Sequence, residues 1–101
     1  MSNMVYIQTH LSEPARIEQL AEEAAELAQA ALKMARVMRD ENPTPVPYME
    51  ALRRLREEYT DVFVAAIAAE LLVDSELGKA KMERWAGRVK ERVEPHDEKQ
   101  G

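Results

Sequence analysis

Apolar residues recur at alternating steps of three and four along the first long segment of the chain, which is the spacing of an α-helix. Ser12 or Glu13 can cap this helix, and Pro14 suits its first position. The helix is expected to end near Arg39, because the following stretch, DENPTPVP, carries three prolines and no helical pattern. Its apolar stripe consists of Ile17, Leu20, Ala24, Leu27, Ala31, Met34 and Met38. We therefore predict a helix over residues 14–39, with small alanines in its packing seam that let another helix approach closely.

The pattern predicts two more helices, over residues 48–73 and 75–93. The second half of the earlier one, VFVAAIAAELLV, is apolar nearly all round and must be covered on several sides. One other long helix cannot supply that cover, so we expect oligomerisation. The last helix is amphipathic, and residues 94–101 are expected to form a frayed polar tail. The expected fold is all-α: a single domain over 1–101, built as an antiparallel helical bundle that is completed by oligomerisation.

Composition narrows the classes of function. The chain has 101 residues, 46% hydrophobic and 33% charged, which favours one small globular domain. It contains no cysteine, so disulfides and thiolate zinc sites are excluded. The formal net charge of −5 argues against binding to nucleic-acid phosphates. No apolar run reaches membrane-spanning length and no secretion signal is recognisable, so a cytoplasmic location is expected.

Two acidic clusters lie beside the apolar stripes, and the first is EEAAEL, residues 22–27. On a helix of about 100° per residue, Glu23 and Glu26 fall in a strip roughly 60° wide, about 90° from the centre of the apolar seam. Both side chains are therefore expected at the edge of the buried face. Glu22 lies further round the helix but stacks on Glu26 at the i,i+4 spacing.

The second cluster, EEYTD, supplies another pair of acids, Glu58 and Asp61, three residues apart. On the helical wheel Glu58 lies among apolar positions, whereas Glu57 lies on another side and is expected to be exposed. If the first two long helices pack antiparallel across the proline-rich loop, the two acidic pairs face each other.

Convergence of four carboxylates predicts a metal ion. Any two like charges about 5 Å apart repel by roughly 3 kcal/mol at an effective dielectric near 20, and a domain has only about 5–15 kcal/mol of stability in total. Oxygen ligands alone favour Mg²⁺ or Mn²⁺, and Mg²⁺ is typically shared with substrate phosphates. The pattern therefore favours a metal-assisted attack of water on a phosphate ester.

Two other interpretations of the acids compete with a shared metal site. A di-iron bundle uses Glu-x-x-His on its helices, but the two histidines, His10 and His96, lie outside the predicted helices. A solvated acidic helix face is common and would explain either cluster taken alone. Two acidic pairs on successive helices, each beside apolar positions, favour a shared site.

At these residues the sequence resembles the MazG-like all-α nucleoside triphosphate pyrophosphohydrolases. The signature of that family, EExxE followed after a spacer by ExxD, is present as Glu22-Glu23-Ala24-Ala25-Glu26 and Glu58-Tyr59-Thr60-Asp61. The resemblance covers residues 17–88. It implies a Mg²⁺-dependent hydrolase, with Mn²⁺ as a possible substitute, that converts an NTP or dNTP to the monophosphate and pyrophosphate. It also implies a homodimer or homotetramer.

The resemblance further implies roles for individual residues. The metal ligands would be Glu23, Glu26, Glu58 and Asp61. Glu22 would be the catalytic residue that positions or deprotonates the attacking water, with a role as a further metal ligand as the alternative. Basic residues of the last helix would hold phosphates, although each of them taken singly also fits a solvated side chain. Besides the family pattern, Trp85 is a candidate for stacking on the base or for a place in a core or interface. Gln19, one turn before Glu23, is a candidate for a hydrogen bond to the nucleotide. The basic candidates are Lys79, Lys81, Arg84 and Arg88.

Three hypotheses for the function follow. The first is a broad nucleotide pyrophosphohydrolase with a house-cleaning or pool-controlling role. The second is a non-enzymatic helical oligomerisation or adaptor module whose acids keep it in solution. The third is a diphosphatase specific for one nucleotide, such as dUTP or dCTP. Because the metal would be shared with substrate phosphates, the first and third predict weak Mg²⁺ binding in the absence of nucleotide.

Overall fold

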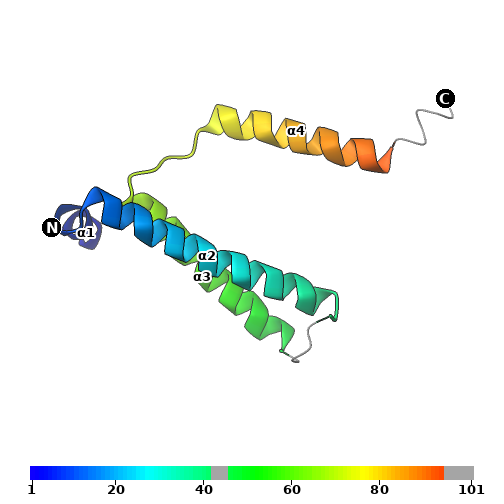
Figure 1. Cartoon of the computed structure of the whole chain (residues 1–101), viewed down its shortest axis with the longest axis horizontal. Helices are drawn as coiled ribbons and strands as arrows, with labels where there is room; N and C mark the ends of the chain where they lie inside the picture. Colours follow the sequence, from blue (N-terminus) through cyan, green and yellow to red (C-terminus); the bar gives the residue numbers. More distant parts are fainter. Residues whose placement is uncertain (42–45, 95–101) are drawn as a thin grey trace. The chain divides into compact units, whose positions relative to one another are not determined.

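The computed structural model describes residues 1–41 and 46–94. Within them every regular element is an α-helix, which confirms the all-α prediction. Figure 1 shows the four helices in chain order: α1 (Asn3–His10), α2 (Glu13–Met38), α3 (Tyr48–Ala68) and α4 (Ser75–Val93). The chain divides into two compact units, Met1–Leu71 with α1 to α3, and Leu72–Gly101 with α4.

α2 and α3 form an antiparallel hairpin in the first unit (Figure 1). Its core consists largely of alanine and one methionine: Ala30 and Met34 on α2 and Ala51, Ala65 and Ala68 on α3 are all buried. Side chains this small let the two helix backbones come close together. The antiparallel arrangement required by the two acidic pairs is therefore present. The prolines at positions 43 and 45 of the connecting loop lie outside the described residues.

The buried face of α2 differs from the predicted seam at alternate positions. Its covered side chains include Leu20, Glu23, Leu27, Ala30, Met34 and Val37. Four members of the predicted stripe, Ile17, Ala24, Ala31 and Met38, are instead exposed. The apolar stripe of α2 is thus wider than the face that α3 covers. α3 likewise leaves large apolar side chains exposed, among them Phe63 and Ile67.

A short helix that the sequence pattern did not predict, α1, precedes the hairpin. Ser2 caps it, accepting a hydrogen bond from the backbone N–H of Val5. α1 contacts α3 through Gln8, whose side-chain amide donates to the carbonyl of Ile67 at 3.1 Å. His10 therefore belongs to a helix, contrary to the prediction, and its ring stacks on Tyr6 at a centroid distance of 3.9 Å.

α3 ends at Ala68, five residues before the predicted boundary at residue 73. Glu70 adopts a left-handed conformation with φ of 60°, and the N–H groups of Glu70 and Leu71 return to the carbonyls of Ile67 and Ala66. This is a Schellman ending, which glycine usually provides. The buried side chain of Arg16, on α2, donates to the carbonyl of Ala68 at 2.8 Å. The end of α3 is therefore capped by a residue far away in the sequence.

α4 begins after Asp74, whose carboxylate accepts a hydrogen bond from the N–H of Leu77 at 3.0 Å. Within its own unit, α4 buries none of its residues. Its apolar side chains, Leu77, Met82, Trp85, Val89 and Val93, are all exposed. Of the predicted tail, residues 95–101 lie outside the described part. No helix in the described residues is both long enough and apolar enough to cross a membrane.

Candidate metal centre

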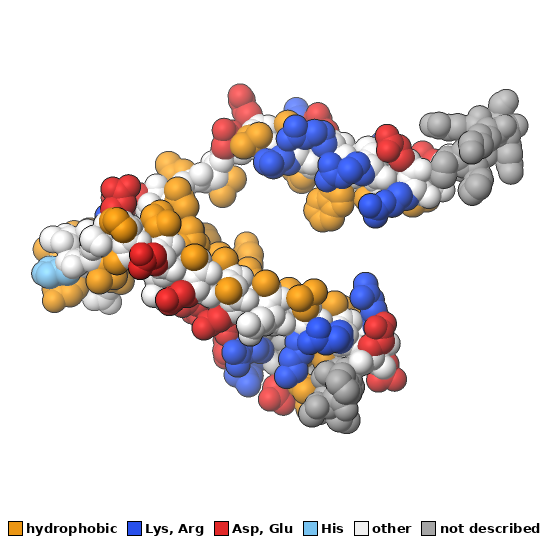
Figure 2. Space-filling view, viewed as in Figure 1, with side chains coloured by type: hydrophobic (Ala, Val, Ile, Leu, Met, Phe, Trp, Pro, Cys, Tyr) orange, Lys and Arg blue, Asp and Glu red, His pale blue; other side chains and the backbone are white. Residues whose placement is uncertain are grey.

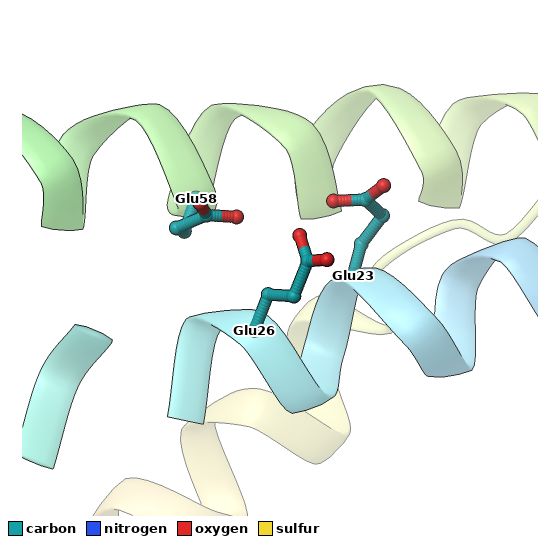
Figure 3. A group of neighbouring side chains, drawn as sticks. All are labelled: Glu23, Glu26 and Glu58. Carbon is teal, nitrogen blue, oxygen red and sulfur yellow. The ribbon is translucent and has the colours of Figure 1, made fainter. Parts of the chain in front are cut away.

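Three glutamates from two helices meet between α2 and α3. Glu23 and Glu26 extend from α2, and Glu58 extends from α3 toward them (Figure 3). One carboxylate oxygen from each lies within 4.8 Å of the other two. Glu58 is buried, Glu23 is half-buried and Glu26 is exposed, so the cluster opens to solvent on one side. Three of the four predicted metal ligands are therefore brought together.

Glu58 occupies a position where helix packing would favour an apolar residue. Ala51, Glu58 and Ala65 follow one another at a spacing of seven along the buried face of α3, with exposed fractions of 5%, 6% and 5%. Glu23 lies in the facing seam of α2, between Leu20 and Leu27. A carboxylate inside a helix–helix seam loses its hydration and needs a compensating partner.

Each of these two seam glutamates has one carboxylate oxygen satisfied and one that is not. Oε1 of Glu23 accepts a hydrogen bond from Nε2 of Gln19 at 2.8 Å, and Oε1 of Glu58 accepts one from Nε of Arg54 at the same distance. The Oε2 atoms of both glutamates are buried and have no hydrogen-bond partner among the described residues. Such orphaned acceptors are rare in proteins, and an unseen ion or water is one of the usual reasons for them.

The electrostatics of the cluster are unfavourable without a cation. The pKa of Glu26 is raised above its ordinary value of 4.5, first by the charge of Glu23 and then by its hydrogen bond to Glu58 and the charge of that residue. Desolvation adds to the increase, and the Arg54 guanidinium acts in the opposite direction. Like charges that are held together in this way favour binding either of a proton or of a metal ion.

The donor set fits a hard divalent cation. It offers only carboxylate oxygens, which suit Mg²⁺ and Mn²⁺ and give a thiophilic metal nothing to bind. Two of these oxygens are buried and unpartnered, and Glu26 adds a third carboxylate on the open side. The residues present therefore fit Mg²⁺, with the solvent-facing side free for further oxygen ligands.

Two other acids of the predicted site lie outside this group. Asp61, one turn after Glu58 on α3, is exposed, as is Glu22 on α2. Glu57 is exposed, as predicted, and forms an ion pair of 2.8 Å with Arg53. Asp61 still borders the same region, because it shares a cavity with Glu23.

That cavity adjoins the three-glutamate cluster. It has a volume of about 280 Å³ and lies among α1, α2 and α3. Its walls are largely apolar, with Ile7, Leu11 and Val64 on one side, and Arg16, Gln19, Glu23 and Asp61 supply its polar groups. Gln19 thus lies at the site, where its amide donates to Glu23. The combination of apolar walls and a few polar groups is typical of small-molecule sites.

The predicted phosphate-binding residues are all on α4, in the second unit. Lys81, Arg84, Trp85 and Arg88 border one hollow of about 500 Å³ on this helix, and Figure 2 shows its basic side chains gathered in a row. Lys79 is not among the residues that line it. The hollow combines three cations with an aromatic ring, a surface suited to an anion that carries a flat group.

Sequence reasoning missed two residues that shape the site, Arg54 and Arg16. Arg54 precedes Glu58 by four positions, which is a recognisable helical ion-pair spacing. Arg16 lies one turn before Gln19, but its contact with Ala68 joins residues 52 positions apart. Only the first of these therefore left a signal in the sequence.

Neither a family model, nor a curated protein, nor a solved structure matches this chain.

Proposed function

We propose that this protein is a Mg²⁺-dependent nucleoside triphosphate pyrophosphohydrolase, which cleaves an NTP or dNTP to the monophosphate and pyrophosphate. The observation that carries the proposal is the pair of buried, unpartnered carboxylate oxygens of Glu23 and Glu58, which lie with Glu26 at a helix–helix seam. The resemblance of EEAAE and EYTD to the two-part signature of the MazG-like enzymes points to the same chemistry.

In this proposal Glu23, Glu26 and Glu58 hold Mg²⁺, and Asp61 joins them when nucleotide is present. When bound, Mg²⁺ would neutralise phosphate charge and lower the pKa of a coordinated water. Glu22, on the exposed side of α2, takes the role of orienting or deprotonating the attacking water. The buried position of Glu58 fixes the α3 side of the site, and the exposed position of Glu26 leaves room for phosphate oxygens.

The cavity beside the cluster supports a substrate with an apolar, flat group attached to its phosphates. At about 280 Å³ it is just below the range of roughly 300–1,000 Å³ for pockets that hold a drug-sized ligand. It therefore suits the nucleoside part of a nucleotide and leaves the triphosphate outside, next to the acids. The row of cations with Trp85 on α4 is a second candidate for contacts with phosphates and base.

The proposal includes a homodimer or homotetramer. Ile17, Phe63 and Ile67 are exposed on the first unit taken by itself, and α4 within its own unit buries none of its residues, Met82 among them. An isolated helix of this length is only marginally stable in water, so α4 needs a surface on which to pack. A second copy of the chain provides such a surface. It would also cover the second half of α3, which is apolar nearly all round. A cytoplasmic location, where nucleotide substrates are found, is part of the same proposal.

The decisive experiment incubates the purified protein with Mg²⁺ and each of the common NTPs and dNTPs, and identifies the products by phosphorus NMR. Monophosphate and pyrophosphate in equal amounts are expected. Glu58→Gln should abolish the reaction, whereas Glu57→Gln, one position earlier on the exposed side of α3, should retain it. If no nucleotide yields pyrophosphate, or if Glu58→Gln remains active, the proposal is wrong.

The same panel decides between the remaining functions. Cleavage of dUTP or dCTP alone would identify a nucleotide-specific diphosphatase. The absence of any product, together with metal-independent stability, would identify a helical oligomerisation or adaptor module. The wide exposed apolar surface favours this second candidate over other non-enzymatic functions.

A further inference from the structure

The two seam glutamates are each held by a donor located one turn earlier on the same helix. Gln19 donates to Glu23 from position i−4, and Arg54 donates to Glu58 from position i−4. Both hydrogen bonds are 2.8 Å long, and both end on the Oε1 atom. The other oxygen of each carboxylate is the buried one, which lacks a hydrogen-bond partner in the part of the chain that the structure describes. The same local arrangement therefore occurs once on α2 and once on α3.

The chemistry of Gln19 and Arg54 fixes which group donates in each of these two hydrogen bonds. An ionised carboxylate only accepts hydrogen bonds, so Gln19 must present its amide nitrogen, and arginine has no acceptor at all. Neither the amide nitrogen of Gln19 nor the guanidinium of Arg54 can act as a metal ligand, because neither offers a lone pair. Each donor occupies Oε1, the outer oxygen of its glutamate, and leaves Oε2, the buried inner oxygen, available. This favours one ligating oxygen per carboxylate over bidentate binding.

Burial distinguishes this ion pair from an ordinary surface pair. The Arg54 side chain is 63% exposed, but its partner Glu58 is only 8% exposed. A very similar pair, Arg53 with Glu57, has the same spacing and the same length of 2.8 Å, but both partners are exposed, at 66% and 54%. Exposed pairs contribute only about 0–1 kcal/mol to stability. The chain thus contains its own control for the effect of the acid cluster.

We propose that Gln19 and Arg54 are positioning residues, which fix the carboxylates of Glu23 and Glu58 so that their inner oxygens bind one divalent cation. The inference rests on the metal site of the proposed function. It gives Gln19 a contact with Glu23, a proposed metal ligand, in addition to any contact with the nucleotide. Partners that orient metal ligands in this way are typically worth 10–100-fold in metal affinity or activity.

The test measures the Mn²⁺ affinity of the full-length protein by calorimetry, at a temperature where circular dichroism shows each variant to be folded. Arg54→Met and Gln19→Met should each weaken Mn²⁺ binding by about tenfold or more. Arg53→Met, the matched control, should change it less than about twofold, because its partner Glu57 is outside the cluster. Arg54→Lys should restore part of the loss, since it returns a charged donor.

Activity provides a second readout that a purely structural role would not change. Loss of positioning should raise the Mn²⁺ concentration needed for half-maximal pyrophosphate release, and excess Mn²⁺ should recover most of kcat. Equal Mn²⁺ affinities for Arg54→Met, Gln19→Met and Arg53→Met would overturn the inference while leaving the metal site intact. No Mn²⁺ binding by the unmodified protein, with or without nucleotide, would overturn both the inference and the proposed function. If Arg54→Met does not fold, Gln19→Met alone decides between these results.

Discussion

Glu23 on α2 and Glu58 on α3 lie in facing seams of one helical hairpin, and each keeps a buried carboxylate oxygen that has no hydrogen-bond partner within residues 1–41 and 46–94. A hairpin built for stability alone would have apolar side chains at both positions. The buried residues Ala51 and Ala65, seven positions before and after Glu58 on α3, follow that pattern. The two glutamates therefore lower the stability of the ligand-free hairpin. This is the pattern expected at a functional site, where a bound ligand offsets the loss of stability.

Replacing Glu58 by a side chain of similar length without charge should stabilise the metal-free protein. We expect Glu58→Met to raise the free energy of unfolding in EDTA by about 1–3 kcal/mol, because a buried charge is removed and exposed Arg54 stays hydrated. Urea denaturation checks this. Glu57→Met, on the exposed side of α3, should change stability by less than about 0.5 kcal/mol. A loss of stability in Glu58→Met would show that the Glu58–Arg54 pair is mainly structural.

The raised pKa of Glu26 gives the metal-free protein a defined response to pH. The folded state binds this proton more tightly than the unfolded state. Ionised Glu26 therefore destabilises the folded state, and this destabilisation is fully present above the folded-state pKa. It is relieved as the pH falls through that pKa toward 4.5, the ordinary value of the group. In EDTA, Glu26→Gln should therefore have a higher Tm than the unmodified protein at pH 7, and the difference should shrink toward pH 4.5.

Thermal unfolding across this pH range, with Glu18→Gln as the control, measures the effect. Glu18 is an exposed acid on the same helix and lies outside the cluster. A Tm difference for Glu26→Gln that is the same at pH 7 and pH 4.5 would contradict the assignment of the shift to Glu26.

The end of α3 should improve when glycine replaces Glu70. An L-residue in the left-handed conformation costs about 1 kcal/mol relative to glycine. Its ion pair with Arg16, 3.8 Å long with the Glu70 side chain 67% exposed, offsets little of that cost. We expect Glu70→Gly to stabilise the protein by about 0.5–1 kcal/mol in urea denaturation. Glu70→Val, which disfavours the left-handed region, should destabilise it, and the opposite order would argue against this ending of α3.

Filling the cavity should impair substrate binding and spare the metal. Leu11→Trp places an indole at the wall of the 280 Å³ cavity, so we expect KM for the preferred nucleotide to rise by about tenfold or more, with Mn²⁺ affinity unchanged. Val5→Trp, at an exposed position of α1 outside the cavity lining, is the control. Equal KM values for the two variants would exclude the cavity as the nucleoside site.

Sequence periodicity predicted the all-α fold and the convergence of three of the four acids, Glu23, Glu26 and Glu58, because both depend on local helical spacing. The wheel correctly separated buried Glu58 from exposed Glu57. It placed the seam of α2 slightly wrongly, since an alanine-rich stripe leaves the covered face ambiguous between neighbours such as Ala30 and Ala31. The half-buried position of Glu23 in the seam followed only from the packing of α3.

Other features depended on contacts that no local pattern reports. The pattern gave no sign of the end of α3, because Glu70 stands where glycine would have marked it and Arg16 supplies the cap from another helix. α1 was missed because its apolar residues are consecutive, as in MVYI at positions 4–7, and do not form a helical stripe.

The central claim is that the carboxylates of Glu23, Glu26 and Glu58 form a divalent-cation site that a nucleotide completes. Electron paramagnetic resonance measures it directly, because the six-line signal of free hydrated Mn²⁺ falls as the ion is bound. With a non-hydrolysable triphosphate analogue present, the unmodified protein and Glu57→Gln should remove more free Mn²⁺ than the analogue alone. Glu58→Gln should remove no more than the analogue. Equal removal by the unmodified protein and Glu58→Gln would contradict the claim.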